Sequence, residues 1–588
     1  MPKAKMPRTI IEWCAAGGAG MEAGDGERRV HGTSRDPRSD TRADAGSEPE
    51  SMIRERKRIV LYYPRQTDER SGTSPGMDLL PVALLSIAAW PVRDGYEVVI
   101  VDGNLYSADE AHRRVVEACE GALLYGTSGI LGHQVADGLH CTRRVKARHP
   151  DLPAVIGGWF ASVMPELQLA TGLYDAVCLG QGEITFRELV QAVDAGTPLD
   201  GVGGLALVRD GHLVRTPPRA VVGWGELLNC PWEILDIEPY RAVQLAGRPT
   251  GEVERMPAPP GFAERPFFGI SYFSSFGCPE PCGFCCSPEV SNLRWKAMPA
   301  DRMVDDLCEL HARWGFDTVR FYDANWGVHE KRSREFSEGM IAQDAHFWWY
   351  MTMQSGSVVR YEEATIDAMR EAGLYVTLLG AETGDDRMMA EIGKHTGATD
   401  NLEAAAAMDR RGVCTWMTYI IGFPGESEAS MMATLDEARR IAARSPLARC
   451  NAWPFRPIPG TAMYAPAIRL GYEPPTSLEG WAADGIYHLR EPWPGQIPRR
   501  VARRRKLYEH YSHLALGLAR ERVGVWERRA RRRIACGDYR FGSVEAKAFD
   551  IYDRIGRRFS GTGARRDRRG YQTSVLSGRD SSPGAESR

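Results

Sequence analysis

Short, uniformly apolar runs alternate with longer amphipathic stretches in the first part of the chain. The apolar runs lie at residues 58–63, 97–101, 122–126, 154–158 and 176–180. A helical stretch at residues 81–94 follows the first of them. Apolar strands that alternate with helices are typical of a parallel sheet with helices on both faces. The pattern therefore predicts an α/β, Rossmann-like domain at residues 56–205.

The same alternation returns in a second block, at residues 263–488. Its strand candidates lie at residues 267–273, 318–322, 348–352, 375–380, 415–421 and 449–455. About six successive β/α units predict a partial or full β/α barrel, whose active loops gather at the carboxyl ends of the strands. The residues between the two blocks, 206–262, are predicted to be a packed linker.

The two ends of the chain lack this periodicity. Residues 1–55 and 561–588 are rich in Gly, Ala, Arg, Asp, Glu and Ser, which predicts a disordered leader and a disordered tail. Residues 489–560 read as helices with many arginines, such as Arg503–Lys506 and Arg528–Arg533. A solvated helical face explains such charge runs most simply, and docking of a phosphate-bearing or carrier-bound substrate is the second interpretation.

Composition narrows the class of protein. A chain of 588 residues is long enough for two or three domains, and its net charge of −3 argues against a nucleic-acid binder. No run of about 18 apolar residues could span a membrane. The 13 cysteines are scattered apart from one group, which does not fit a disulfide framework. These features predict a cytoplasmic protein with neither a membrane nor a nucleic acid as its partner.

One group of cysteines carries the strongest chemical signal. Cys278, Cys282 and Cys285 follow the strand candidate at 267–273. Three thiolates can hold three irons of a 4Fe–4S cluster and leave the fourth iron open, whereas an electron-carrying cluster normally has four cysteine ligands. A structural zinc site is the alternative, but it usually needs a second pair of ligands, which the downstream sequence lacks. Cys286 is expected to be a buried or incidental thiol.

The cysteine spacing, with Phe284 directly before the last cysteine, resembles the signature of radical S-adenosylmethionine (SAM) enzymes, in which the open iron binds SAM. The segments Gly380–Gly384 and Tyr419–Glu426 match two further parts of that family's pattern. The resemblance implies that SAM is bound by Phe284, Gly380, Glu382 and Gly422. Glu426 is expected to shape its own loop or to cap the next helix.

Polar residues after two other strands are candidates for substrate contacts. Asp323 and Asn325 follow the strand candidate at 318–322, and Gln354 follows the one at 348–352. Because the carboxyl ends of barrel strands form the active face, these side chains could reach a substrate. Hydrogen bonding within the core is the competing explanation for all three.

The first block resembles the cobalamin-binding domain that precedes many radical SAM barrels. The matching pieces are residues 81–102, 126–128, 157–162 and 180–183, in this order. The resemblance implies cobalamin contacts at Ser128, Gly157, Gly158, Gly180, Gly182 and Glu183. The motif D-x-H-x-x-G is missing, which implies that no protein histidine binds cobalt; the loop between Pro64 and Pro81 is expected to cover that lower face. A vestigial or other nucleotide-binding domain is the alternative, although no G-x-G-x-x-G motif supports NAD.

The two resemblances together imply a cobalamin-dependent radical SAM methyltransferase. Such an enzyme would transfer a methyl group from SAM, via methylcobalamin, to an unactivated carbon of a natural-product intermediate. It would need a 4Fe–4S cluster, SAM, cobalamin, a small-molecule or carrier-bound substrate, and an electron donor such as flavodoxin or ferredoxin. A rearrangement, ring contraction or oxidative cyclisation without methyl transfer is one alternative, and a non-catalytic sensor of cobalamin or cluster is another.

Overall fold

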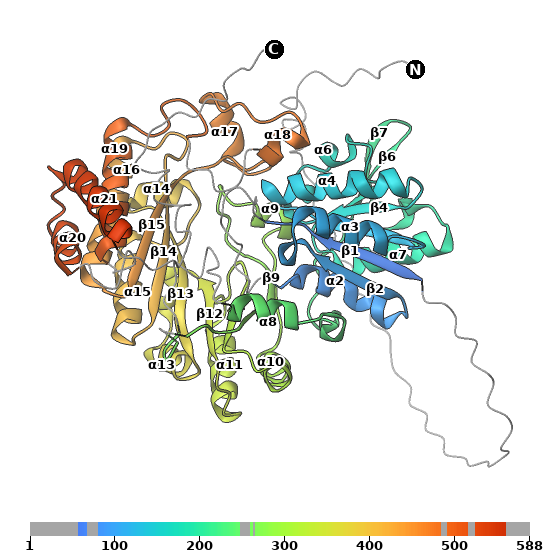
Figure 1. Cartoon of the computed structure of the whole chain (residues 1–588), viewed down its shortest axis with the longest axis horizontal. Helices are drawn as coiled ribbons and strands as arrows, with labels where there is room; N and C mark the ends of the chain where they lie inside the picture. Colours follow the sequence, from blue (N-terminus) through green and yellow to red (C-terminus); the bar gives the residue numbers. More distant parts are fainter. Residues whose placement is uncertain are drawn as a thin grey trace, which may run out of the picture.

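Two parallel sheets, joined by a packed linker, make up the body of the protein (Figure 1). The computed structural model describes residues 57–66, 80–246, 259–262, 265–483, 491–515 and 524–559. The predicted disordered leader and tail lie outside these residues, and so does most of the loop expected to cover the lower face of cobalamin. Within the described residues, no helix is both long and apolar enough to cross a bilayer.

The first sheet has the strand order β2-β1-β3-β4-β5-β6-β7. Its parallel part consists of β1 (Arg58–Tyr63), β2 (Glu97–Asp102), β3 (Leu124–Ser128), β4 (Ala154–Gly157) and β5 (Ala176–Cys178). Helices α3 (Ala108–Ala118) and α4 (His133–Arg148) share one apolar core with it, and α2 (Val82–Arg93) and α7 (Glu183–Ala195) share the other. The two cores lie on opposite faces of the sheet, which confirms the predicted doubly wound domain.

The sheet continues beyond the predicted boundary at residue 205. Strands β6 (Leu205–Arg209) and β7 (His212–Arg215) extend it as an antiparallel hairpin. The two-residue turn between them, Asp210–Gly211, has positive φ angles of 49° and 77°, as tight hairpins require. The first sheet therefore extends to Arg215 rather than ending at residue 205, because the D-G turn folds the chain back into an antiparallel hairpin.

The rest of the predicted linker packs against both sheets, as expected. The indole of Trp232, in η4 (Trp232–Ile234), stacks on Tyr272 with ring centroids 6.3 Å apart. Tyr240, in α8 (Glu238–Leu245), donates a 2.8 Å hydrogen bond to the buried carboxylate of Asp102 at the end of β2. The linker thus fixes the first sheet to the second.

The second sheet is a partial barrel of six parallel strands in consecutive order. They are β8 (Gly269–Tyr272), β11 (Thr318–Phe321), β12 (Trp348–Met353), β13 (Leu374–Glu382), β14 (Cys414–Ile421) and β15 (Ala448–Pro454). One large core joins the outer face of these strands to α10 (Ala300–Trp314), α11 (Glu330–Ala342), α13 (Glu363–Glu371), α15 (Ala398–Arg410) and α16 (Glu428–Arg444). Among the described residues β8 and β15 do not pair, so the barrel stays open at one side, and the predicted partial β/α barrel is confirmed.

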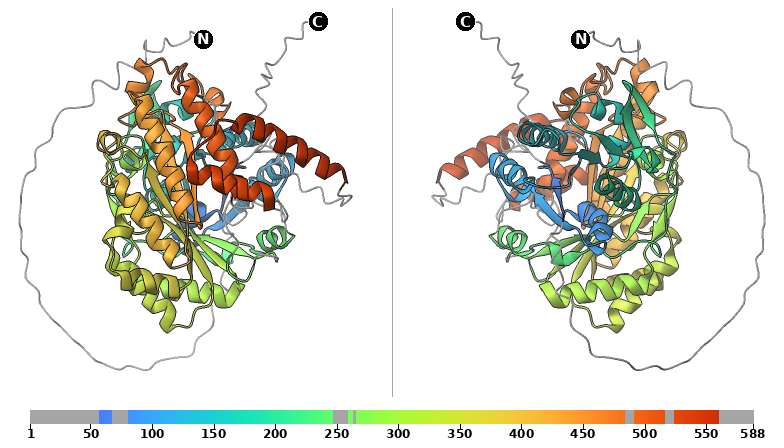
Figure 2. Two further views of the ribbon diagram at one scale, coloured as in Figure 1. Left: turned by 90° about the vertical axis from the view of Figure 1, so that its left-hand side faces the viewer. Right: turned by 90° about the vertical axis from the view of Figure 1, so that its right-hand side faces the viewer.

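The arginine-rich segment forms three helices on the outside of the barrel, drawn in red in Figure 2. They are α19 (Arg499–Ala515), α20 (Gly524–Cys536) and α21 (Gly542–Phe559). Arg505 donates to the carbonyl of Ala452 in β15 and pairs with Glu509, while Arg529 and Arg533 both pair with Glu545. These arginines hold the helices to each other and to the barrel, so much of the charge run has a structural role.

Candidate active site

The cysteine loop leaves the barrel at the carboxyl end of β8. A short antiparallel hairpin, β9 (Ser275–Gly277) and β10 (Trp295–Ala297), brackets the loop on both sides. Gly277 has φ +78°, and a Cβ there would overlap the carbonyl oxygen of Arg294. The hairpin therefore closes only with glycine at this position, and it places the three cysteines on the active face that the sequence predicted.

The thiols of this loop interact electrostatically. Burial raises the pKa of Cys282 to about 12, and the charges of Cys285 and Cys278 act on it in the same direction. The thiol of Cys286 hydrogen-bonds to Cys285 and lowers the pKa of Cys285 to about 7. Among the described residues, no three His, Cys, Asp or Glu side chains converge on a single-ion site. Three thiolates in one loop can hold three irons of a cluster, whereas a structural zinc site usually takes four protein ligands.

Strand β13 ends in a strained residue that holds a buried ion pair. Glu382 has φ +56°, a conformation that costs a non-glycine residue about 1–2 kcal/mol. Its carboxylate accepts a 2.9 Å hydrogen bond from the ammonium of Lys394, and the two side chains are only 9% and 7% exposed. A Cβ on Gly380 would overlap this carboxylate. Strain and buried charge of this kind cluster at functional sites.

Lys394 is a site residue that the sequence did not predict. Burial alone would lower its pKa, but Glu382 and the thiols of Cys282 and Cys278 raise the pKa above its usual value. The ammonium therefore joins the predicted SAM-binding carboxylate to the cysteine loop. A lysine after α14 (Asp386–Glu391) reads as a solvated charge in the sequence, and only the packing shows that it is buried.

The loop after β14 is built by Glu426, as predicted. Its carboxylate accepts hydrogen bonds from the backbone N–H of Gly422 at 2.6 Å and of Phe423 at 3.0 Å. Gly422 has φ +79°, which glycine adopts freely. The ring of Phe423 lies 5.6 Å from that of Phe284, so the loop is brought against the residue beside Cys285.

Glu426 makes the stability of this loop depend on pH. Burial raises the pKa of its carboxyl from 4.5 to about 7. Between pH 4.5 and about pH 7 this carboxyl is protonated in the folded chain but has lost its proton in the unfolded chain. The free energy of unfolding therefore falls as pH rises through this range. The fall is at most about 3 kcal/mol. Comparing denaturant unfolding at pH 5 and pH 8 should show a smaller fall for Glu426→Gln than for the native chain. The exposed Glu473→Gln is the control; an unchanged pH dependence in Glu426→Gln would contradict the assignment.

The three predicted substrate contacts lie in different surroundings. Asp323 is buried and accepts hydrogen bonds from the backbone and hydroxyl of Ser274 and from the hydroxyl of Ser275, which fits the core explanation. Gln354 accepts a long hydrogen bond, 3.4 Å, from Thr396. Only Asn325 has a buried side-chain oxygen without a partner in the described part of the chain. Asn325 therefore remains the best placed of the three to bind a ligand.

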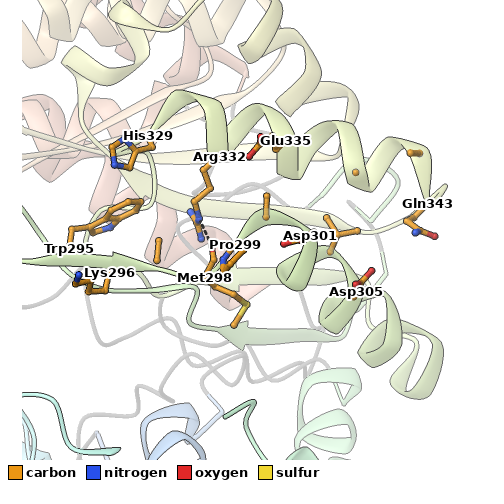
Figure 3. Close-up of a pocket in the computed structure, with 15 residues that line it drawn as sticks. Trp295, Lys296, Met298, Pro299, Asp301, Asp305, His329, Arg332, Glu335 and Gln343 are labelled. Carbon is orange, nitrogen blue, oxygen red and sulfur yellow. Dashed lines mark hydrogen bonds between the residues drawn. The ribbon is translucent and has the colours of Figure 1, made fainter. Parts of the chain in front are cut away.

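A cavity of about 740 Å³ lies outside the barrel, between β10, α10 and α11 (Figure 3). Trp295, Lys296, His329 and Arg332 are among the residues that line it. Arg332 is held by the carbonyl of Met298 and the hydroxyl of Ser274. The lining includes none of the predicted site residues, so we assign this cavity no part in the active site.

The six residues predicted to bind cobalamin all lie at one edge of the first sheet. Ser128 ends β3, Gly157 ends β4 with Gly158 directly after it, and Gly180, Gly182 and Glu183 follow β5. Gly158 and Gly180 have φ values of +100° and +67°, and at Gly157 only Cys178 lies within 4 Å of where a Cβ would be. At Gly157 a flat ring could approach the backbone closely, whereas Gly158, Gly180 and Gly182 lie against Gly129, Val290 and Ile87.

Glu183 also fits a ligand at this edge. One of its carboxyl oxygens accepts a 2.8 Å hydrogen bond from Ser86, and the other is buried without a partner in the described residues. Burial raises the pKa of the carboxyl. A buried carboxyl oxygen without a partner in the described residues can form a hydrogen bond with a ligand that reaches this edge.

Gly158→Ala should disrupt this edge. A Cβ at Gly158 would lie 2.8 Å from the carbonyl oxygen of Gly129, and the residue would be held at φ +100°. We expect a loss of about 1–3 kcal/mol in stability and at least a tenfold rise in the Kd for cobalamin. Cobalamin retained after gel filtration, read by its visible absorbance, measures the effect. Gly201→Ala, where no atom lies within 4 Å, is the control, and full retention by Gly158→Ala would contradict the assignment.

The cobalamin edge and the SAM loops share one apolar cluster. Phe160, which follows Gly158, packs in the same cluster as Phe423 and Phe455, with Phe284 against it. A Cβ at Gly180 would lie 3.4 Å from the carbonyl of Val290, just after the cysteine loop. The carboxyl edge of the first sheet is thus in contact with the carboxyl end of the barrel.

Comparison with known proteins agrees with this geometry. Residues 72–190 match the B12 binding domain family, and residues 272–438 match the radical SAM superfamily. An uncharacterised methyltransferase from Pyrococcus horikoshii is 26% identical over 368 residues, 61% of this chain and 73% of that protein. An anaerobic magnesium-protoporphyrin IX monomethyl ester cyclase from Synechocystis is 24% identical over 353 residues, 59% of this chain and 66% of that protein.

A solved structure shares the fold. The radical S-adenosylmethionine methyltransferase TsrM from Kitasatospora setae, with cobalamin and a 4Fe–4S cluster bound, superposes with a TM-score of 0.54 at 18% identity. The match covers 70% of this chain and 74% of that one. The chain thus carries a B12 binding domain directly in front of a radical SAM domain, and the cofactors of these two domains are cobalamin, SAM and a 4Fe–4S cluster.

Proposed function

We propose that this enzyme is a methyltransferase that moves a methyl group from SAM, by way of cobalamin, to an unactivated carbon of a natural-product intermediate. The observation that carries the proposal is the apolar cluster shared by Phe160 at the cobalamin edge and Phe423 beside the SAM motifs. Through this cluster the candidate cobalamin site and the candidate SAM site lie next to each other. The P. horikoshii relative and TsrM are both named methyltransferases, which supports the proposal.

The chain's own residues would hold and shield the reacting groups. Cys278, Cys282 and Cys285 would bind three irons of the cluster and leave one iron for SAM. When bound, the cluster and SAM supply a radical that removes a hydrogen atom from the substrate, and cobalamin supplies the methyl group. Glu382, fixed by Lys394, would accept hydrogen bonds from SAM. The apolar wall around Phe423 would keep water from the site.

We further propose that a flavodoxin or ferredoxin supplies the electron that the cluster needs, and that the protein works in a reducing cytoplasm. Every cysteine in the described part of the chain is a free thiol, which fits a reducing compartment.

The proposal is tested by the products formed from SAM. Anaerobically reconstituted protein would be given cobalamin, a reductant and trideuteromethyl SAM, and 5′-deoxyadenosine and S-adenosylhomocysteine would be quantified together by mass spectrometry. Both products, with the label on cobalamin, are the expected result. Deoxyadenosine without S-adenosylhomocysteine would overturn methyl transfer.

A non-methylating cyclisation is the second candidate. It is favoured by the match to the magnesium-protoporphyrin cyclase, which spans 59% of this chain. That reaction would give deoxyadenosine alone, so the same experiment separates the two functions.

A further inference from the structure

The inner face of the barrel carries polar groups that the cofactors do not explain. Along β14 and β15, Met417, Tyr419, Cys450 and Ala452 pack in the outer core beneath the helices. Because successive strand residues point to opposite faces, Trp416, Arg449 and Trp453 point to the inside. A separate inner cluster confirms this arrangement: it consists of Tyr350, Tyr375, Val376, Cys414 and Trp416, with Trp348, Leu378 and Trp453 packed against it.

Two of these inner residues have buried donors without acceptors. Trp416 and Arg449 are register partners on neighbouring strands. The indole N–H of Trp416 and the Nε and Nη1 of Arg449 are buried, and none has a hydrogen-bond partner in the described residues. Leaving buried donors unpaired is costly, most of all on a charged group. The thiol of Cys414 lies beside the guanidinium of Arg449, but the described residues leave the indole N–H of Trp416 and the Nε and Nη1 of Arg449 without an acceptor.

The charge of the interior favours an anion. Within the six described strands, the charged residues at inward positions are Arg320, Arg449 and Glu382. Glu382 is already paired with Lys394 at the mouth of the barrel. On the other side of the interior, the guanidinium of Arg320 lies over the ring of Tyr322, 3.9 Å from its centroid. Of these inward charges, Arg449 is the one that the structure leaves with buried donors lacking acceptors among the described residues.

The walls of this interior are flat and aromatic. Tyr350, Tyr375 and Trp416 are nearly buried in it, whereas Trp348 and Trp453 remain partly exposed. Rings of this kind stack on conjugated ligands in offset or edge-to-face arrangements. Arg449 lies four residues before Trp453 on β15, which corresponds to roughly 13 Å along a strand. A ligand that reaches from Arg449 to the mouth must therefore be elongated.

We propose that the substrate is an elongated, conjugated molecule with a terminal oxyanion, a carboxylate or a phosphate, that accepts hydrogen bonds from Arg449 and Trp416. Its rings would lie among the inner aromatic side chains, and its other end would reach the mouth of the barrel beside Glu382. The inference rests on the proposed function, because it names the class of substrate that this site would take.

Binding of simple probes tests the inference without any turnover. The full-length protein, loaded with cluster and cobalamin but not with SAM, would be dialysed to equilibrium against naphthalene-2-carboxylate, 2-naphthyl phosphate or naphthalene-2-carboxamide. We expect at least one anionic probe to bind at least tenfold tighter than the carboxamide. Which anion binds tighter distinguishes a carboxylate substrate from a phosphate substrate. Equal Kd values for all three probes would overturn the inference.

Substitutions at Arg449 test whether this residue causes the preference for anionic probes. Arg449→Gln should bind the anions no tighter than the carboxamide, and Arg449→Lys should keep most of the preference because it keeps the charge. Arg440→Gln is the matched control: Arg440 also has a buried Nε, but it lies on α16 outside the barrel, and its Nε forms an ion pair with Asp436 at 3.3 Å. An anion preference that survives in Arg449→Gln would refute the role of this residue.

Loss of a cofactor in the variant, and failure of the proposed methyl transfer, can each be told apart from failure of this inference. If Arg449→Gln loses its cluster or its cobalamin, Trp416→Phe is used in its place, because this change removes the indole donor and keeps an aromatic ring. Trp416→Phe should weaken anion binding threefold or more. An unchanged Kd for the anions would overturn the inference. A protein that shows the anion preference but makes no S-adenosylhomocysteine would contradict the proposed methyl transfer and leave the binding site standing.

Discussion

Alanine at Cys278, Cys282 or Cys285 is expected to abolish both cluster assembly and SAM cleavage. In the proposed site each thiolate would bind one iron, and a three-cysteine site has no spare ligand. Burial raises the pKa of Cys278 and of Cys282, so these thiols ionise readily only when metal binds them. Iron and sulfide per chain after anaerobic reconstitution, together with 5′-deoxyadenosine formed, measure the loss. The expected values are about four irons in the native chain and near zero in each variant.

Two other cysteines serve as controls for this result. Cys308, half-buried on α10, is far from the loop in sequence, and Cys308→Ala should keep the full iron content. Cys286→Ala should also keep it, because Cys286 is expected to be an incidental thiol. Full iron in any single variant of the triad would contradict the cluster assignment, and loss of iron in Cys286→Ala would make Cys286 a ligand.

Lys394→Met is expected to lower the stability of the barrel by about 3–5 kcal/mol, since it leaves the buried carboxylate of Glu382 without its partner. The same change should weaken SAM binding, because Glu382 would no longer be held at the mouth of the barrel. The double variant Glu382→Gln, Lys394→Met should recover part of the stability, since it removes both charges together. Urea unfolding of the cofactor-free protein and the Kd for SAM of the loaded protein measure the two effects.

An exposed pair provides the matched control. Lys331 lies 3.6 Å from Glu335 on α11 with its side chain 87% exposed. Lys331→Met should change stability by less than about 1 kcal/mol, as is usual for surface ion pairs. If Lys394→Met costs no more than Lys331→Met, the buried pair does not form in solution.

The sequence predicted the parallel strands of both sheets and indicated the three candidate cluster ligands. Apolar runs such as those at β1 and β14 could be recognised because a strand covered on both faces has no polar side to interrupt the run. The three cysteines could be recognised because their chemistry depends on spacing within one short loop. The hairpin of β6 and β7 was missed, because its pairing depends on a two-residue turn rather than on apolar content.

The surroundings of the candidate site residues could not be predicted from the sequence. Asp323 and Asn325 look alike after β11, yet hydroxyls from the β9 hairpin surround Asp323 and leave the oxygen of Asn325 without a partner. Lys394 and Arg449 read as ordinary surface charges in the sequence. Each lies inside the barrel only because of contacts with residues distant along the chain.

By itself, the sequence determined the order of the two domains, the parallel strands within them and the position of the cysteine loop, since these depend on local spacing and on the alternation of apolar and polar residues. Only the tertiary structure decided which charges are buried, which are paired and which strand positions face the interior. The physical reason is that burial and pairing depend on strand register and on contacts between segments far apart in the chain. The ion pair of Lys394 and the unpaired donors of Arg449 both arise in this way.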